Sequence, residues 1–415
     1  MLAAVSNFAS ETFSALRVRN YRLYFIGQGI SLSGTWMSTI GQAWLVLKLT
    51  ESGTALGLVS AFQYLPVLLL GPLGGVVTDR FPKRKLLYFT QGAFCLLDLI
   101  LAILVVTGKV QLWMVYSLAL CFGLLVAVDN PTRQSFVHEM VGSKFLRNAV
   151  TLNSMEINLA RVIGPALAGV LIASVGMASC FFINSFSFLA VLICLFLMRS
   201  KDLHPIPPIR QFKGQLSRGF AYMWKTPVIR EVLIMMAIVG TLTYEFQVSL
   251  PLIAKYTFHG NARTLALLTS ATGIGSVLGG LFTASRGKAG TFWVAWASLG
   301  FGTAILAVSV LPTLALAATA MVIVGIFSIA FNSLGNTTLQ LECTPEMRGR
   351  VMSLWAVTFI GSNAIGGPVI GWVGEHADPR WSLALGGIAA IVAGVYGLIS
   401  SKKAYSKIDL AVETA

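Results

Sequence analysis

Four ionisable side chains lie within long apolar runs of the chain. Asp98, Glu156 and Glu245 are acids, and Arg161 follows Glu156 by five residues. Ionisable groups in such surroundings are costly, so they are rare and usually functional. A carboxylate that is buried in one state and meets water or a cation in another can carry a proton between the two. Asp98, Glu245 and Glu156 are therefore candidate proton-coupling groups. For Asp98, a structural pair with Arg161 or a polar packing contact is the alternative.

Uncharged polar side chains recur at helical spacing along the first apolar run. They share one face of a helix, and Trp36 beside them can stack on an aromatic ligand. A later run adds two asparagines that can lie opposite. These residues predict the wall of a water-filled cavity for an amphiphilic molecule, with hydrogen bonding between helices as the alternative. The predicted cavity residues are Gln28, Ser31, Thr35, Trp36, Thr39, Gln42, Tyr244, Asn332 and Asn336.

The composition excludes a water-soluble protein. Of the 415 residues, 56% are hydrophobic and 11% are charged, whereas soluble domains are about 25% charged. Lipid must therefore surround most of the chain. The five cysteines and four histidines show no metal-binding spacing, so we expect neither a disulfide framework nor a metal site.

Twelve apolar segments are long enough to cross a membrane, which needs about 20 residues each. They predict an all-α membrane protein. The segments are 22–48, 56–78, 86–107, 112–129, 152–174, 178–198, 231–253, 264–285, 291–310, 313–334, 351–374 and 381–400.

The basic residues fall mostly on one side of these segments. The net charge is +14, from 30 Lys and Arg against 16 Asp and Glu. With the N-terminus in the cytoplasm, 23 of the 30 lie on the cytoplasmic side and 5 on the other. Such asymmetry is typical of cytoplasmic loops rather than of a nucleic-acid site. It predicts an even number of spans, cytoplasmic termini and no nucleic-acid partner.

A polar, proline-containing linker divides the chain near its middle. We expect an N-terminal six-helix half at 1–198, a cytoplasmic linker at 199–227 and a C-terminal six-helix half at 228–415. The pattern of Gly164, Pro165 and Gly169 returns about 202 residues later around 366–371. This offset predicts a parallel repeat of the two halves, with chance similarity of small residues as the alternative.

The loop after the second segment carries a spaced motif. It reads Gly75-Val-Val-Thr-Asp79-Arg80-Phe-Pro82-Lys83-Arg84-Lys85. Glycine permits close helix contact, and the basic run favours a tight cytoplasmic turn. The stretch resembles motif A of the major facilitator superfamily, G-x-x-x-D-R-x-G-x-R/K-R/K. Pro82 replaces the usual glycine, as it does in the branch that holds siderophore exporters, such as those for enterobactin, and macrolide exporters.

The fifth segment holds a second, partial motif. Arg161, Gly164, Pro165 and Gly169 resemble the second half of motif C, the antiporter motif G-P-x-x-G/A-G. The proline bends the helix, and the glycines admit a neighbouring helix. In the family this bend is associated with export.

The fourth segment departs from the drug/proton antiporter pattern, because residues 112–128 contain no charge where motif B has an arginine. Its end, with Asp129, Pro131, Arg133 and Gln134, is similar to the D-x-P-x-R-Q stretch of the siderophore and macrolide branch. We expect Asp129 to lie near Arg80 or Arg84 and to form part of a cytoplasmic charge latch, with the motif A residues as gating elements.

The resemblance covers roughly residues 17–400, and further expectations about architecture and transport follow from it. It implies two pseudo-repeated six-helix halves around a central cavity, in a monomer of the bacterial inner membrane. It also implies alternating access and export of a siderophore or drug-like compound by proton antiport. Within this family geometry the seventh segment lines the cavity, which favours Glu245 as the coupling group, whereas depth in the segment favours Asp98. A place near the outer mouth is the alternative for Glu245.

Other functions stay open at this point. A lysophospholipid or lipid flippase and a nutrient importer share the same fold. A membrane-embedded enzyme would need a clustered acid, base or metal group, which the spans do not show, so we expect no enzymatic activity. No Walker sequence is present, so we expect the proton gradient as energy source and no cofactor. A transport-inactive sensor or scaffold is a further alternative.

Overall fold

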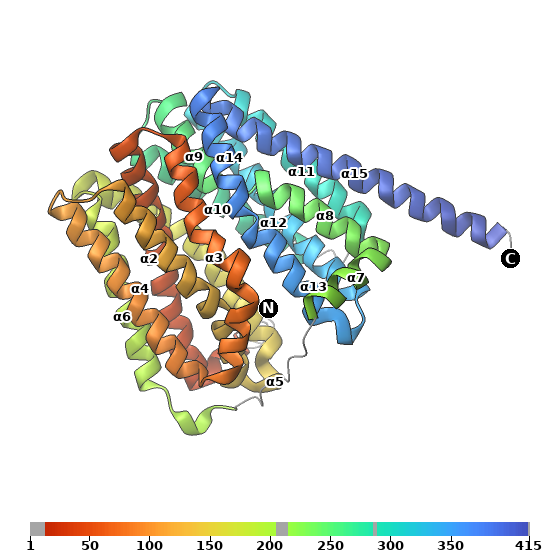
Figure 1. Cartoon of the computed structure of the whole chain (residues 1–415), viewed down its shortest axis with the longest axis horizontal. Helices are drawn as coiled ribbons and strands as arrows, with labels where there is room; N and C mark the ends of the chain where they lie inside the picture. The colour runs from red at the N-terminus through yellow and green to blue at the C-terminus, as the bar shows by residue number, and fades with distance from the viewer. Residues whose placement is uncertain (1–12, 205–214, 285–288, 414–415) are drawn as a thin grey trace, which may run out of the picture.

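The computed structural model describes residues 13–204, 215–284 and 289–413, and this part of the chain is helical throughout with no strand. Figure 1 shows the helices side by side in one bundle. In chain order they are η1 (Ser14–Arg17), α2 (Arg19–Thr50), α3 (Gly53–Arg80), α4 (Lys83–Val106), α5 (Leu112–Ser174), α6 (Ala178–Leu197), η2 (Ser200–Asp202), α7 (Gln215–Lys225), α8 (Pro227–Leu242), α9 (Phe246–Leu252), η3 (Ile253–Thr257), α10 (Ala262–Ala284), α11 (Thr291–Val310), α12 (Leu314–Glu342), α13 (Pro345–Ala356), η4 (Val357–Gly361), α14 (Asn363–His376) and α15 (Pro379–Glu413).

The helices account for twelve membrane crossings. Ten helical stretches among the described residues are long and apolar enough to span. One of them, α5, has 63 residues and at about 1.5 Å per residue is long enough to cross twice. Its bend is at Gly142, where φ is 64°, a value that glycine adopts without strain. The 32-residue α2 adds the last crossing, although its polar and charged residues make it less apolar than the other ten stretches.

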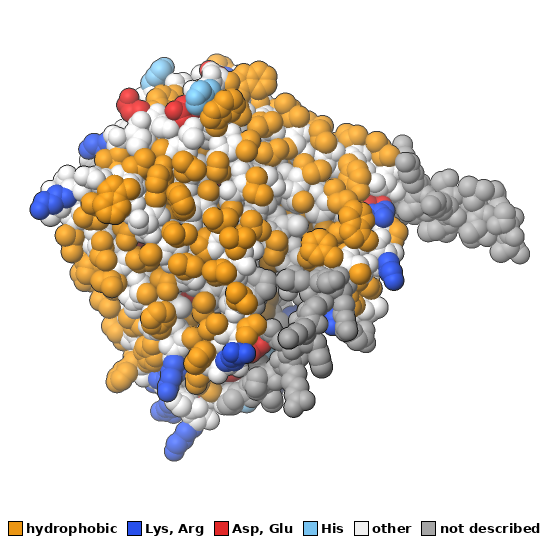
Figure 2. Space-filling view, in the orientation of Figure 1, with side chains coloured by type: hydrophobic (Ala, Val, Ile, Leu, Met, Phe, Trp, Pro, Cys, Tyr) orange, Lys and Arg blue, Asp and Glu red, His pale blue; other side chains and the backbone are white. Residues whose placement is uncertain are grey.

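The outer surface suits a lipid environment. Large apolar side chains such as Phe89, Ile193 and Phe196 are exposed, and hydrophobic side chains cover most of the face seen in Figure 2. In water such a surface would drive aggregation. The expected all-α fold is thus confirmed, with one correction to its bounds: residues 130–151, expected between spans, are helical and continue α5 across its bend.

Two groups of helices meet along glycine-rich faces. The first group is α2–α6 and the second is α8–α15. In the contact of α3 with α14, Gly57 faces the carbonyl of Gly367 and Gly371 faces that of Gly53, with no room for a Cβ. In the contact of α5 with α10, Gly169 faces Ala266. Small residues let the backbones approach closely, which gains packing energy in lipid.

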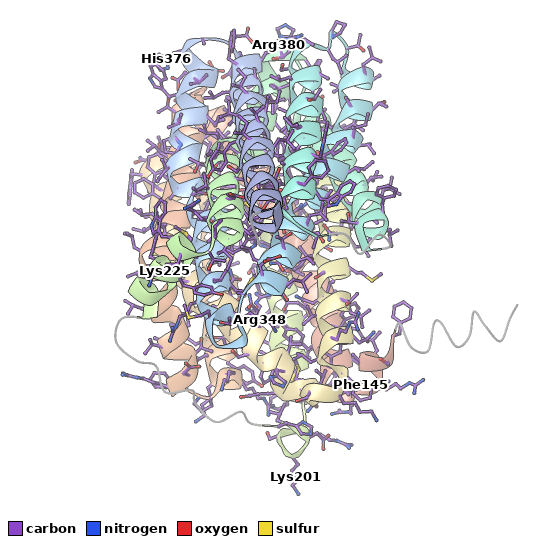
Figure 3. The ribbon with its side chains drawn as sticks, turned by 90° about the vertical axis from the view of Figure 1, so that its right-hand side faces the viewer. Phe145, Lys201, Lys225, Arg348, His376 and Arg380 are labelled. Atoms are coloured by element: carbon purple, nitrogen blue, oxygen red, sulfur yellow. The ribbon has the colours of Figure 1, made fainter. Side chains whose placement is uncertain are left out.

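The two ends of the bundle differ in charge and contacts. We call the end with Glu51, Lys255 and Glu375 the Glu51 end, and the end with Arg84, Arg133 and Arg348 the basic end. Figure 3 shows His376 and Arg380 at one end, and Phe145, Lys201, Lys225 and Arg348 toward the other.

Polar contacts join the groups at the Glu51 end. A Glu375 carboxylate oxygen accepts hydrogen bonds from Ser52 Oγ (2.7 Å) and the Thr54 backbone N–H (2.8 Å). Lys255 Nζ lies 3.1 Å from a Glu51 carboxylate oxygen, and Tyr256 donates to the Glu51 carbonyl (2.7 Å). The carboxylate of Glu375 thereby caps the N-terminus of a helix in the other group, a favourable position for an anion. These contacts close the Glu51 end.

Two helices are interrupted beside the contact of the groups. The chain leaves α8 at Leu242 and resumes as α9 at Phe246, and Glu245 at the break has φ −78° and ψ 37°. A π-helical turn, η4, precedes α14. Such irregular backbone at membrane depth is tolerated where protein surrounds it or where it lines a cavity.

The contact between α3 and α14 predicts that alanine lowers the stability at a glycine inside the contact but not at a glycine outside it. Gly371→Ala places a methyl group against the Gly53 carbonyl, so we expect a loss of about 1–3 kcal/mol in unfolding free energy. Gly92→Ala is the matched control, because no atom lies within 4 Å of the position of its Cβ. Thermal unfolding of the two purified variants measures the difference, and equal stabilities would contradict the packing described.

Candidate functional site

A cavity of about 230 Å³ lies between the two helix groups. The first group contributes Trp36 and Thr39 from α2, Tyr64 from α3 and Arg161 from α5. The second contributes side chains from the α8–α9 break, α10, α12, η4 and α14. Because both groups form its wall, a relative movement of the groups changes the shape of the cavity. The residues of the second group include Tyr244, Phe246, Gln247, Thr269, Ser328, Phe359 and Asn363.

Arg161 supplies the charge of this cavity. It is the one charged side chain among the residues that line this cavity in the described part of the chain. Its guanidinium carbon lies 5.0 Å from the centre of the Trp36 ring, a cation–π arrangement. Its Nε is buried without a hydrogen-bond partner. We expected uncharged walls, so the structure corrects that expectation by turning Arg161 into the cavity.

Aromatic and amide groups complete the wall and link the two groups. Gln247 donates to Tyr64 Oη at 3.3 Å, across the boundary between the groups. Tyr244 donates to the Ser328 carbonyl at 2.7 Å and meets the Phe359 ring edge-on, with 5.2 Å between the ring centres. The Asn363 Oδ1 atom is buried without a partner. Tyr64, Gln247 and Asn363 are cavity residues that the sequence pattern did not single out.

The cavity is built by the repeated glycine–proline segments. Gly164 of α5 packs on Trp36 and the Ser33 carbonyl of α2, while Gly366 of α14 packs on the Thr241 carbonyl at the end of α8. Arg161 and Asn363 are 202 residues apart, which is the offset of the predicted repeat, and both line the cavity. A comparison at this offset could have identified Asn363.

Asp98 lies in a separate, smaller cavity of about 40 Å³. It is buried, and it accepts hydrogen bonds from Ser38 Oγ (2.9 Å) and Asn184 Nδ2 (2.6 Å). The structure therefore joins Asp98 of α4 to α2 and α6, while Arg161 lies on Trp36 instead. Thr39 lines both cavities, so only one residue of α2 stands between them at that point.

Glu245 occupies the break between α8 and α9 but does not line the central cavity. It is 2% exposed, and a Cβ on Gly366 of α14 would lie 2.8 Å from its Oε1. That oxygen has no hydrogen-bond partner. The adjacent Tyr244 and Phe246 face the cavity in its place, because the break in the helix turns Glu245 toward α14.

Glu156 is buried between α5 and α2. Both of its carboxylate oxygens lack hydrogen-bond partners, and Oε1 lies 2.8 Å from the position of a Cβ on Gly29. Gln28 beside it is 2% exposed, with an unpartnered Oε1. Glu156 therefore faces the helix contact rather than the central cavity.

The other predicted cavity residues lie at different places along their helices and do not line the central cavity. Thr35 and Gln42 line the Asp98 cavity, and Gln28 and Ser31 are buried. Asn332 and Asn336 follow Ser328 on α12 by one and two turns and do not line the central cavity, and Asn336 Oδ1 accepts a hydrogen bond from Gln340. Trp36, Thr39 and Tyr244 are the predicted residues that line it.

A family model described as transmembrane secretion effector matches residues 10–414. The chain belongs to this family of the major facilitator superfamily. The staphyloferrin A transporter of Staphylococcus aureus is 24% identical over 339 residues, which cover 80% of this chain and 84% of the relative. The enterobactin exporter EntS of Citrobacter koseri is 22% identical over 378 residues, or 90% of each chain.

Solved transporters share the fold of this secretion effector. A bacterial homologue of the human lysosomal transporter Spinster matches with a TM-score of 0.73 at 15% identity, over 93% of this chain and 97% of that one. The nucleoside transporter NupG matches with a TM-score of 0.74 at 14% identity, over 93% and 99%. The chain is thus a multi-pass, all-helical membrane transporter with the major facilitator fold, and the expected family is confirmed.

The motif residues of this secretion effector lie near the basic end. Arg84 donates to the carbonyls of Leu195 (2.6 Å) and Phe196 (3.3 Å) and to Ser200 Oγ (2.7 Å). Lys83 pairs with Glu139 at 2.9 Å. Arg80 and Lys85 are exposed, Asp79 is half-buried, and Gly74, next to Gly75, lies against the Ala127 carbonyl.

The structure corrects the expected partner of Asp129. Its carboxylate is buried and pairs with Arg133 on the next turn, and it accepts from Thr90 (2.6 Å) and Gln91 (2.9 Å) of α4. Arg84 instead donates to carbonyls at the end of α6. The network of Asp129 therefore lies within the first helix group.

The two cavities predict which positions of α2 react with a water-soluble thiol reagent. In a variant without native cysteines, Thr39→Cys is expected to react with a methanethiosulfonate, because Thr39 lines both cavities. Ser31→Cys is the control, since Ser31 is 1% exposed on the same helix. Mass spectrometry of the labelled protein gives the extent of reaction, and equal labelling at both positions would contradict this assignment.

Proposed function

We propose that this secretion effector exports a small amphiphilic molecule, a siderophore or a drug-like compound, from the cytoplasm across the bacterial inner membrane in exchange for protons. The observation that carries the proposal is the cavity between the two helix groups, with wall residues from both. A ligand at such a boundary is exposed to one side and then the other when the groups rock, which is alternating access.

The direction is inferred from charge and from the relatives. The basic end carries most of the Lys and Arg, so the positive-inside rule assigns it, with both termini, to the cytoplasm. The Glu51 end is joined by the contacts of Glu375 and Lys255, which leaves the basic end for loading. EntS is an enterobactin exporter, and the partial antiporter motif at Gly164, Pro165 and Gly169 supports the same direction.

Asp98 is the proton-coupling group that the geometry supports best. Its two carboxylate oxygens accept hydrogen bonds from α2 and from α6. A proton on Asp98 makes one oxygen a donor, so the bond to Ser38 or to Asn184 must rearrange. Because α2 also carries Trp36 and Thr39, protonation is linked to the wall of the central cavity. Glu245 and Glu156 remain candidates for the same role.

Loss of the carboxylate at position 98 predicts uncoupled transport. In inside-out proteoliposomes with an imposed pH gradient, Asp98→Asn is expected to reduce gradient-driven uptake of enterobactin or staphyloferrin A at least tenfold while ligand binding persists. Glu245→Gln and Glu156→Gln test the other two candidates. Asp202→Asn, at an exposed acid of η2, is the control.

Uptake assays in the same vesicles distinguish the proposed function from the competing ones. Uptake of enterobactin, staphyloferrin A or ethidium into inside-out vesicles supports export. Movement of a fluorescent lysophospholipid alone supports a flippase, and uptake only into right-side-out vesicles supports an importer; either result would overturn the proposal. Transport by the unmodified protein that does not depend on the pH gradient would contradict proton antiport.

A further inference from the structure

We infer that Arg161, held against Trp36, is the receptor for an anionic group on an aromatic or otherwise planar substrate. This inference rests on the proposed function and names the chemical class of its substrate. The shared chemistry is a negatively charged oxygen group, such as a carboxylate, next to a flat apolar body.

The first support is an unneutralised charge at the centre of the bundle. The ion pairs found among the described residues are Lys83 with Glu139, Arg133 with Asp129 and Lys255 with Glu51, and Arg161 takes part in none of them. Asp98 is held by Ser38 and Asn184. An arginine stays charged under all physiological conditions, and a cation at membrane depth normally has a partner.

The nearest acid along the chain does not supply that partner. Glu156 precedes Arg161 by five residues on the same helix, which places the two side chains roughly 140° apart around its axis. Glu156 faces Gly29 of α2, whereas Arg161 faces the central cavity. Glu245, the other buried acid with an unpartnered oxygen, faces Gly366 of α14 and does not line the cavity. These positions leave the anionic group of a ligand as the partner of Arg161.

The second support is the way in which the guanidinium is held. The guanidinium carbon lies 5.0 Å from the centre of the Trp36 ring, and this cation–π contact holds the group beside the ring. The guanidinium Nε carries one N–H donor, and it is buried and unpartnered. A guanidinium edge with free N–H groups matches the two oxygens of a carboxylate. Burying an N–H donor without an acceptor is energetically unfavourable, and an anionic ligand supplies the acceptor.

The third support is the aromatic part of the cavity wall. The rings of Tyr64, Tyr244 and Phe359 line the same cavity. Aromatic rings hold flat apolar groups by stacking and edge contacts. The unpartnered Asn363 Oδ1, at the repeat position of Arg161, adds an acceptor for a hydroxyl or amide N–H. The cavity therefore selects a molecule with an anionic end and a flat apolar end.

The test compares two probes that differ in charge but hardly in shape. Binding of 2-naphthoate and of 2-naphthamide to the purified protein in detergent is measured by calorimetry. Unmodified protein is expected to bind naphthoate at least about tenfold more tightly, because the carboxylate offers the guanidinium two negatively charged oxygens, whereas the amide offers one neutral oxygen. Arg161→Gln is expected to reduce naphthoate affinity much more than naphthamide affinity, so that the preference for the anion is lost.

Three variants complete the experiment. Arg161→Lys keeps the charge and loses the planar fork, so an intermediate affinity is expected. Trp36→Leu is expected to weaken naphthoate binding more than Trp36→Phe does. Arg263→Gln is the control, because Arg263 is an exposed arginine of α10 outside the cavity. Thermal unfolding verifies that each variant is folded.

Several outcomes overturn the inference. Equal binding of both probes to the unmodified protein, or binding of neither, removes the anion receptor. Equal loss of both probes in a folded Arg161→Gln protein assigns the residue to the shape of the cavity instead. Binding in detergent involves no proton gradient, so this test is independent of the transport assay. Charge-selective binding that depends on Arg161 can be found although gradient-driven transport fails. Gradient-driven transport can also be found although binding is not charge-selective.

Discussion

The absence of water from the bilayer interior governs every part of this structure. A charge or polar group that leaves water there must find a partner inside the protein. Asp129 meets this demand with Arg133, Thr90 and Gln91, and Asp98 meets it with Ser38 and Asn184. Arg161 meets it only in part, with the face of Trp36. Groups with complete partners stabilise one arrangement of helices. Glu156, Glu245 and Arg161 each keep an unpartnered buried atom, and of these three Arg161 lines the central cavity, where we propose that the ligand binds.

Close backbone contact determines where that place lies. Glycines on α5 and α14 allow each helix to touch a neighbour in its own group and one in the other group. Gly164 lies against α2, while Gly169 of the same helix lies against α10. The cavity occupies the space beside these contacts, where bulkier side chains replace glycine. The packing that joins the groups thus also positions the residues that line the cavity.

In the proposed antiport, a proton and a substrate communicate through the helix that contacts both cavities. Asp98 and Arg161 are on different helices and have different partners, yet α2 contacts both through Ser38 and Trp36. A change in the hydrogen bonds of Asp98 acts on α2, and α2 carries the ring that holds the guanidinium. Coupling through one packed helix needs no direct contact between proton and substrate, and a rigid helix can transmit it.

The sequence by itself determined the membrane setting, the number of crossings and the family, because these depend on average apolarity, on charge between spans and on short local motifs. It also identified Asp98, Glu156, Glu245 and Arg161 as buried ionisable groups. It did not determine which way each side chain points. The break before α9 turns Glu245 toward α14, and the pitch of α5 turns Glu156 away from the cavity and Arg161 into it. Tyr64, Gln247 and Asn363 join them from helices far apart in the chain. Only tertiary packing decides such neighbours, because rotation of a helix by a fraction of a turn leaves its composition unchanged and changes every contact it makes.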